Sequence, residues 1–398
     1  MIAYDIERLH NAALVNKAKR WHKRKFISAD QLGLIEKKYP VFIHLNVFIK
    51  ILLFVFSWIL MGGIMGMYST VFLNSFFGSS GENAMLFMCV LFSLICFVAL
   101  EVIIRKTDFY RTGIDEALLY MGLSLLLTAI GIVVGNVFDE QNSFFHFAIL
   151  SLIVFAAAAV RYADAIVSIA LVFCAYTVFF ILILKLGAIA KIIMPFALMI
   201  VSVPLYLYAK KYKEREDLFC WKNCFFIAES ISLLVFYAAC NYYVIRESSI
   251  AYFDMQVNEG EDIPLAFLFY FLTAVVPLLY IFWGLKKKDR TILWIGLLLV
   301  VAASLTFKNY FSLGHPEIIL TVAGVIMILV AYFSIKYLKI PRNGITFQAD
   351  PDEDNLLNSN SEALIIAQTF SQQAQTKQSD SPQFGGGEFG GGGAGSDY

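Results

Sequence analysis

Between positions 45 and 338 the chain alternates between long apolar stretches and short polar connections. Ten stretches have about twenty residues each, the length of α-helix that crosses a bilayer core of about 30 Å. Each stretch is apolar on every side, as expected for a helix surrounded by lipid. We therefore predict an all-α fold, a polytopic transmembrane helix bundle of about ten spans, at residues 46–72, 84–104, 117–138, 143–160, 165–184, 188–209, 224–245, 263–284, 291–307 and 317–338.

Lysine and arginine are concentrated in alternate connections between these spans. All but four of the 31 lie in the N-terminal segment, at the entrance of the first span, in every second connection or after the last span; the exceptions are Lys185, Lys191, Arg246 and Lys308. Because basic connections stay on the cytoplasmic side of a membrane, we predict that both termini are cytoplasmic. The formal net charge is zero, which gives no indication of a nucleic-acid partner.

The composition divides the chain into three regions. Residues 1–44 are predicted to form a basic cytosolic helical hairpin, 45–338 the ten-helix transmembrane domain, and 339–398 a disordered cytosolic tail rich in Gly, Ser and Gln. Ser28 opens the second hairpin helix, and Gln31 follows at the spacing of a capping box. The hairpin could dock on anionic lipid or on a protein partner, and a solvated cap that follows the charge rule is the preferred interpretation. The Gly-rich tail is either a recognition segment for a partner or a solubilising one.

Ionisable residues inside spans are costly in lipid and therefore point to function. Glu229 lies about five residues inside the seventh span without a visible local partner, so it could exchange protons. Glu101 has Arg105 four residues later, the spacing of an intrahelical ion pair. Arg161 and Asp164, in the short fourth connection, are three apart, and one helical turn would pair them. Glu229, Glu101, Arg161 and Asp164 form the candidate intramembrane polar site.

Proline and glycine mark candidate helix breaks. Pro195 and Pro204 lie in the sixth span and Pro277 in the eighth, and each removes a backbone hydrogen bond and can kink its helix. Gly62 and Gly63 lie in the first span. Interrupted first and sixth helices are typical of a broken-helix site like that of five-plus-five inverted-repeat transporters. Ordinary close packing of helices explains the same residues and is the preferred interpretation.

The sequence carries no motif of an enzyme or of a cofactor site. It contains neither His-Glu-x-x-His nor Gly-x-Ser-x-Gly, and its five histidines are too dispersed to indicate a metal site. Cys220 and Cys224 share a helix face without further ligands nearby, and the six cysteines form no disulfide framework. We therefore predict no catalytic residue, no metal and no cofactor.

The N-terminal third carries a resemblance. A basic helix leads into Phe26-Ile-Ser-Ala-Asp-Gln-Leu-Gly-Leu-Ile-Glu-Lys-Lys-Tyr-Pro40, and Asn46-Val-Phe-Ile-Lys-Ile-Leu-Leu-Phe and Met61-Gly-Gly-Ile-Met-Gly66 follow. Over about residues 20–75 this resembles bacterial membrane proteins of the domain-of-unknown-function 2157 type, in which a helical segment reading roughly Ile-Ser-x-x-Gln precedes the membrane region. Lys25-Phe26 stands where that family usually has Gly. The resemblance implies a bacterial cytoplasmic membrane and no particular activity.

Two classes of function remain open. The first is a non-enzymatic membrane component that assembles with partners through the hairpin or the tail. The second is a transporter of a small neutral or lipid-like solute, with a cavity near Glu229 and the proline-containing helices. The scarcity of charge in the central third of the spans argues against strongly ion-coupled transport. An intramembrane enzyme is a distant third interpretation.

Overall fold

The computed structural model describes residues 2–42, 45–76, 81–107, 110–253 and 262–310, together with Val325, Ile328, Tyr332 and Lys336. Within these residues all regular secondary structure is helical, which confirms the predicted all-α class. Nine of the described helices are long and apolar enough to cross a membrane. Of the predicted tenth span, only the four single residues named above are described, and each is helical. The predicted tail, 339–398, lies outside the described residues.

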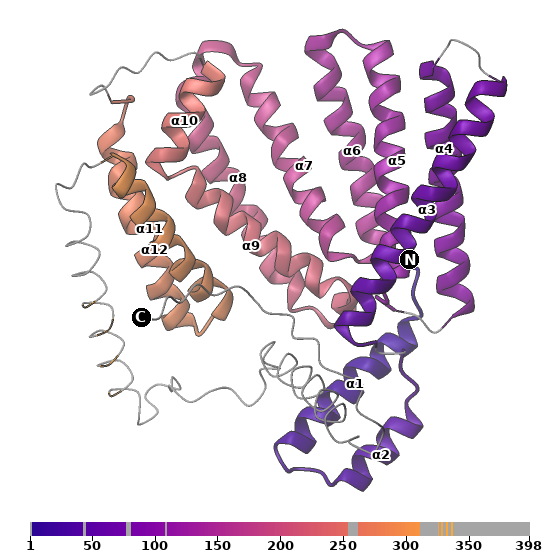
Figure 1. Ribbon diagram of the computed structural model, residues 1–398. Helices are drawn as coiled ribbons and strands as arrows, with labels where there is room; N and C mark the ends of the chain where they lie inside the picture. The colour runs from indigo at the N-terminus through magenta and orange to yellow at the C-terminus, as the bar shows by residue number, and fades with distance from the viewer. Residues whose placement is uncertain are drawn as a thin grey trace, which may run out of the picture. The chain divides into compact units, whose positions relative to one another are not determined.

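The described helices follow one another along the chain in the order shown by the colours of Figure 1. Two short helices come first, six long helices (α3 to α8) follow, the broken segment of α9 and α10 comes next, and the antiparallel pair of α11 and α12 comes last. Short 3-10 turns, η1 (Gly187–Ile189) and η2 (Glu216–Trp221), precede α8 and α9. The α-helices are α1 (Ile6–Lys23), α2 (Ala29–Lys38), α3 (Val47–Phe76), α4 (Gly81–Lys106), α5 (Ile114–Val137), α6 (Glu140–Tyr162), α7 (Ala165–Leu184), α8 (Ala190–Lys213), α9 (Lys222–Ala238), α10 (Tyr242–Phe253), α11 (Ala266–Lys287) and α12 (Arg290–Tyr310).

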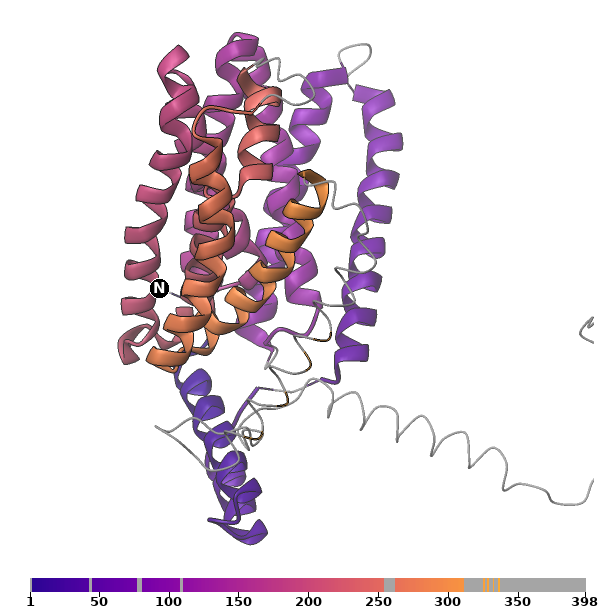
Figure 2. The same ribbon diagram turned by 90° about the vertical axis from the view of Figure 1, so that its left-hand side faces the viewer.

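Consecutive long helices run antiparallel, so every second connection reaches the same end of the bundle. The ends of α4, α6, α8 and α11, the connections that follow them and the first residues of the next helices together carry most of the basic residues outside the hairpin, and we call this end the basic end. The last pair, α11 and α12, lies side by side in both Figure 1 and Figure 2. A Cβ atom added to Gly284 would lie 2.8 Å from the backbone nitrogen of Leu293, so this pair packs at a distance that only glycine permits.

The seventh predicted span, 224–245, is wrong as a continuous helix. Helix α9 ends at Ala238 and α10 begins at Tyr242. The side chain of Asn241 accepts a hydrogen bond from the backbone nitrogen of Val244 at 3.3 Å, as a capping residue does at the start of a helix. The hydroxyl of Thr273, on α11, accepts one from the backbone nitrogen of Tyr242 at 3.0 Å. These side chains satisfy backbone donors that the break would otherwise leave unpaired in lipid.

The helix break is also tied to α12. The amide nitrogen of Asn241 donates to the hydroxyl oxygens of Thr306 and Tyr237, each at 3.0 Å. Asn241, Thr273 and Thr306 are all buried. Side-chain hydrogen bonds therefore stabilise the interruption and join α9, α10, α11 and α12 there.

At the five candidate helix breaks, the helices continue. Helix α8 runs through Pro195 and Pro204, α11 through Pro277, and α3 through Gly62 and Gly63. A proline removes a single backbone donor, and lipid favours the helical state for all the others. A break at these positions was a wrong expectation, since the interruption lies at 239–241 instead.

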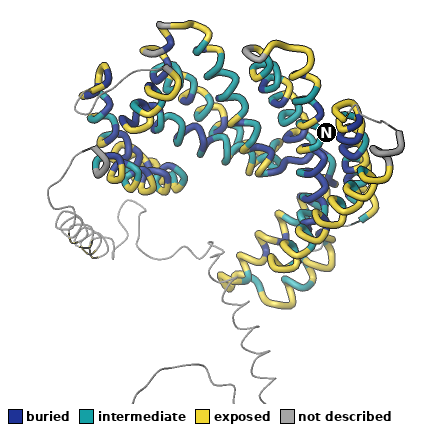
Figure 3. The backbone as a smooth tube through the Cα atoms, turned by 45° about the horizontal axis from the view of Figure 1, so that its top comes forward, coloured by how far each residue is buried: buried dark blue, intermediate teal, exposed yellow. Residues whose placement is uncertain are grey.

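The N-terminal hairpin has the predicted capping box and a mostly exposed surface. The Ser28 hydroxyl accepts from the backbone nitrogen of Gln31 at 3.2 Å, and the Gln31 side chain accepts from the backbone of Ser28 at 2.9 Å. Lys19 on α1 and Glu36 on α2 form an ion pair at 3.3 Å. Helix α2 has no buried residue, and the yellow trace in Figure 3 follows the exposed faces.

The start of the chain is anchored in the bundle at the basic end. The hydroxyl of Tyr4 donates to Asp115 Oδ2 at 2.9 Å, and the backbone nitrogen of Ala3 donates to the carbonyl of Arg161 at 2.7 Å. Asp115 is buried and also accepts from the backbone nitrogens of Arg111 and Thr112. Burial and the negative charge of Asp115 raise the pKa of Tyr4 well above its ordinary value, so its hydroxyl keeps the proton that it donates.

Candidate functional site

A cavity of about 470 Å³ lies between α8, α9, α11 and the start of α12. We call it the α8–α12 cavity. Its size falls within the range of small-molecule sites, roughly 300–1,000 Å³. Most of its lining is aliphatic or aromatic, which suits an apolar occupant. The lining consists of Ser202, Val203, Tyr206, Leu207, Ser232, Leu233, Phe236, Leu272, Val276, Leu279, Tyr280, Trp283, Lys287 and Ile292.

The cavity opens through the outer surface of the bundle. Leu207 on α8 is 57% exposed and Trp283 on α11 is 51% exposed, although both line the cavity. Ser232 and Val276, by contrast, lie at its buried side. In a membrane-spanning bundle, apolar residues exposed along the spans face lipid chains rather than water. The opening therefore leads to the bilayer.

Hydroxyl groups inside the cavity are already engaged by the helices. The Ser202 hydroxyl donates to the carbonyl of Leu198 at 2.7 Å, and Ser232 donates to Ala228 at 2.6 Å. The hydroxyl of Tyr280 donates to the carbonyl of Leu233 at 3.3 Å. Since their protons are used, these groups leave mainly acceptor capacity for an occupant.

An ion pair between Lys210 and Asp289 joins the two walls of the cavity at its basic end. Lys210 follows Tyr206 by one helical turn and donates to its hydroxyl at 3.2 Å. Asp289 lies in the turn between α11 and α12, and its other oxygen accepts from the backbone nitrogen of Thr291 at 3.0 Å. Burial opposes ionisation of Asp289, but the hydrogen bond and charge of Lys210 hold its pKa below the ordinary value, so it is ionised at neutral pH.

Glu229 has a partner that the sequence does not reveal. Its side chain is fully buried, and Oε2 pairs with the ammonium group of Lys213 at the end of α8. Within the described residues, Oε1 has no hydrogen-bond partner. The expectation of an isolated carboxyl was therefore wrong, because the turn between α8 and α9 returns the chain so that positions 213 and 229 meet.

Glu101 and Arg161 come together across two helices. The guanidinium of Arg161 on α6 donates to both carboxylate oxygens of Glu101 on α4, at 2.9 and 2.7 Å. The expected intrahelical pair with Arg105 is also present, at 3.7 Å, but Arg161 is closer. Tyr162 donates a further hydrogen bond to Glu101 at 3.3 Å. Glu101 therefore links α4 to the end of α6.

Arg161 and Asp164 do not share a helical turn, so the premise of their predicted pairing was wrong. Helix α6 ends at Tyr162, Ala163 has a left-handed backbone with a φ of 50°, and Asp164 is extended. The carboxylate of Asp164 caps α7 by accepting from the backbone nitrogen of Val167 at 3.0 Å. It also accepts from the hydroxyl of Tyr120 on α5 at 3.1 Å.

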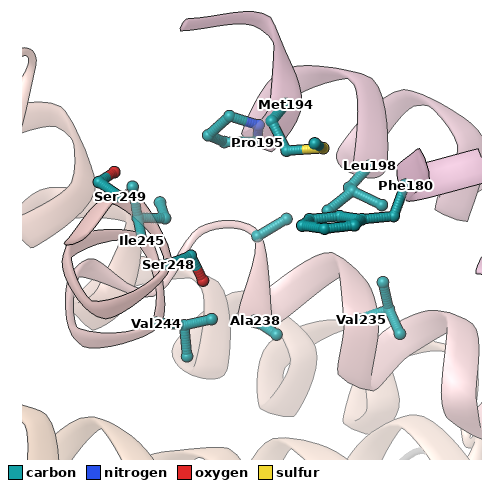
Figure 4. Close-up of a pocket in the computed structure, with 11 residues that line it drawn as sticks. Phe180, Met194, Pro195, Leu198, Val235, Ala238, Val244, Ile245, Ser248 and Ser249 are labelled. Carbon is teal, nitrogen blue, oxygen red and sulfur yellow. The ribbon is translucent and has the colours of Figure 1, made fainter. Parts of the chain in front are cut away.

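A second, smaller cavity of about 90 Å³ lies beside the helix break (Figure 4). Met194 and Pro195 of α8 lie on one side of it, and Val235 and Ala238 of α9 lie on the other. Ser248 is one of only two hydroxyl-bearing residues in its lining. The rest of the lining is apolar, so this cavity offers few groups that could bind a polar ligand.

The described residues contain no group of three or more His, Cys, Asp or Glu side chains arranged to hold a metal ion. Comparison with known proteins found no matching family model, no matching curated protein and no matching solved structure. The class of the protein therefore comes from its own architecture: it is a multi-pass transmembrane helix bundle with an apolar cavity. The resemblance of residues 20–75 to the domain-of-unknown-function 2157 type stays a prediction.

Replacing Lys213 by Met is expected to destabilise the bundle by about 3–5 kcal/mol, because it leaves the buried charge of Glu229 without a partner. The double variant Lys213→Met with Glu229→Gln should recover most of this loss. Reversible denaturant titration in mixed micelles measures both. Lys211→Met is the control, since Lys211 is exposed on the same helix end; equal losses for the two lysine variants would contradict the role of the pair.

Proposed function

We propose that this membrane protein binds a lipid-like solute in the α8–α12 cavity and acts as a carrier for it. The observation that carries the proposal is an apolar cavity of about 470 Å³ whose opening lies among lipid-facing side chains. A water-soluble polar solute would meet few hydrogen-bonding groups there and would lose its hydration. An acyl or similar apolar chain would contact side chains that are as apolar as the chain itself.

The cavity walls are suited to changes of width. Pro204 lies on α8 next to Val203, and Pro277 lies on α11 next to Val276. Each proline lacks the backbone donor that would stiffen its helix, so each wall can bend at cavity height. The Lys210–Asp289 pair holds the same two walls together at the basic end. The walls can therefore bend while the ion pair holds the basic end of the cavity fixed.

We also propose the bacterial cytoplasmic membrane as the site of action, with both termini in the cytoplasm. The alternation of basic connections supports this orientation, since α4, α6, α8 and α11 all deliver their basic residues to one end. The polar end of the cavity then faces the inner leaflet.

Filling the cavity tests the proposal. Leu272→Trp places a larger ring in the lining and should lower the affinity for a medium-chain alcohol such as dodecanol at least tenfold, measured by equilibrium binding to the full-length protein in nanodiscs. Leu298→Trp is the matched control, because Leu298 is exposed on α12 and does not line the cavity. Saturable binding that survives Leu272→Trp in a folded protein would contradict a site in this cavity.

A second function, assembly with a protein partner, is favoured by the N-terminal hairpin. Phe26 and Leu34 are 71% and 68% exposed there, among many basic residues. Unlike the apolar residues of the spans, they belong to helices and a turn outside the predicted bilayer region. A partner with an acidic surface and an apolar centre would fit them.

The double variant Phe26→Ser with Leu34→Ser removes the apolar centre and leaves the anchor of Tyr4 on Asp115 intact. If the protein assembles through the hairpin, a defined cross-linked adduct that the wild type forms in intact membranes should be absent in this variant, while dodecanol binding is unchanged. Lys37→Met with Lys38→Met tests the charge alone. Identical adducts in the wild type and the Phe26–Leu34 variant would remove the hairpin as an assembly site.

A further inference from the structure

Resting on the proposed carrier function, the structure also indicates which kind of amphiphile the cavity takes. We infer that the solute has an anionic polar end that lies on the ammonium group of Lys287, while its single apolar chain fills the α8–α12 cavity. Lys287 is the last residue of α11 and is the one charged side chain among the lining residues.

Two of the lysines near this end of the cavity already have carboxylate partners. Lys210 is paired with Asp289, and Lys213 is paired with Glu229. Lys287 makes no ion pair with a described residue; its ammonium group lies 5.9 Å from the ring centroid of Trp283, over the ring. Because the lining contains no carboxylate, its uncompensated charge is positive and complements an anion.

Because the bundle is surrounded by lipid, the polar end of the solute decides which amphiphile binds best. Lipid chains are as apolar as the side chains of the cavity, so an acyl chain that moves from bilayer to cavity gains little from the hydrophobic effect. The difference between competing amphiphiles therefore comes from their polar groups. An anion can form a charge-assisted hydrogen bond with Lys287, whereas a neutral hydroxyl forms a weaker one and a cation is repelled.

The position of Lys287 also fits an amphiphile that stays in its leaflet. Residues Leu272, Val276 and Leu279 extend the lining from the middle of α11 towards Lys287 at its end. A long lysine side chain at a helix terminus reaches the interfacial region, where the polar end of a bilayer amphiphile resides. The chain then lies inside the bundle and its anionic group stays at the interface.

The test compares three probes with the same twelve-carbon chain: dodecanoate, dodecanol and dodecyltrimethylammonium. Equilibrium binding to the full-length protein is measured in zwitterionic nanodiscs at pH 8, where a fatty acid is substantially ionised. The wild type is expected to bind dodecanoate about tenfold more tightly than dodecanol, as one charge-assisted hydrogen bond implies, and the cationic probe most weakly.

Lys287→Met should reduce dodecanoate affinity to that of dodecanol without changing dodecanol affinity. Lys286→Met is the matched control, since Lys286 is the adjacent basic residue, lies over Phe282 and does not line the cavity; it should change affinity less than twofold. Equal wild-type affinities for acid and alcohol, or equal effects of the two lysine variants, would overturn the anionic assignment and leave the carrier function standing. Absence of saturable binding for all three probes would overturn the carrier function itself.

Discussion

A charge that enters a lipid-surrounded helix bundle needs a partner from another part of the chain, and this requirement organises the basic end of the protein. Glu101 and Arg161 join α4 to α6, Glu229 and Lys213 join α9 to α8, and Asp289 and Lys210 join the α11–α12 turn to α8. Replacing both partners of such a pair by apolar residues often costs little stability, whereas removing one partner leaves a buried charge unpaired. Their value here lies in fixing which helices meet and where.

The α8–α12 cavity depends on this fixed end. Two ion pairs hold α8 to α9 and to the α11–α12 turn, and the cavity begins one helical turn from Lys210. At the far end, Asn241, Thr273 and Thr306 tie the broken α9–α10 segment to α11 and α12. The apolar middle contains Pro204 and Pro277, and hydrogen bonds from Tyr280 to Leu233 and from Tyr176 to Ser202 cross between helices there. Helices α9, α11 and α12 are thus tied at both ends around the apolar space, whereas these polar contacts hold α8 at the basic end.

The spans could be predicted from the sequence because lipid leaves the backbone few alternatives to a helix. Contacts between spans could not be predicted in the same way. The partner of Glu229 lies sixteen residues away across a turn, and that of Lys210 lies 79 residues away, so neither pair has a local spacing signature. The helix break lies at none of the candidate prolines and glycines. The available signal for it was Asn241, a single polar amide in an apolar stretch, because asparagine is a preferred capping residue.

Asp115 was missed for a different reason. An acidic residue in the first turn of a helix is common, because it complements the helix dipole, and it needs no further explanation. Only the fold shows that Tyr4, from the start of the chain, lies on this carboxylate and that the segment before α1 is part of the bundle core.

The central claim is that a lipid-like chain occupies the α8–α12 cavity, and an electron cryomicroscopy structure in nanodiscs made with native lipid tests it most directly. We expect one continuous, elongated density that contacts Leu233 and Val276 and ends beside Lys287. Closure of the cavity by protein side chains, or isolated water-like densities in place of a chain, would contradict it.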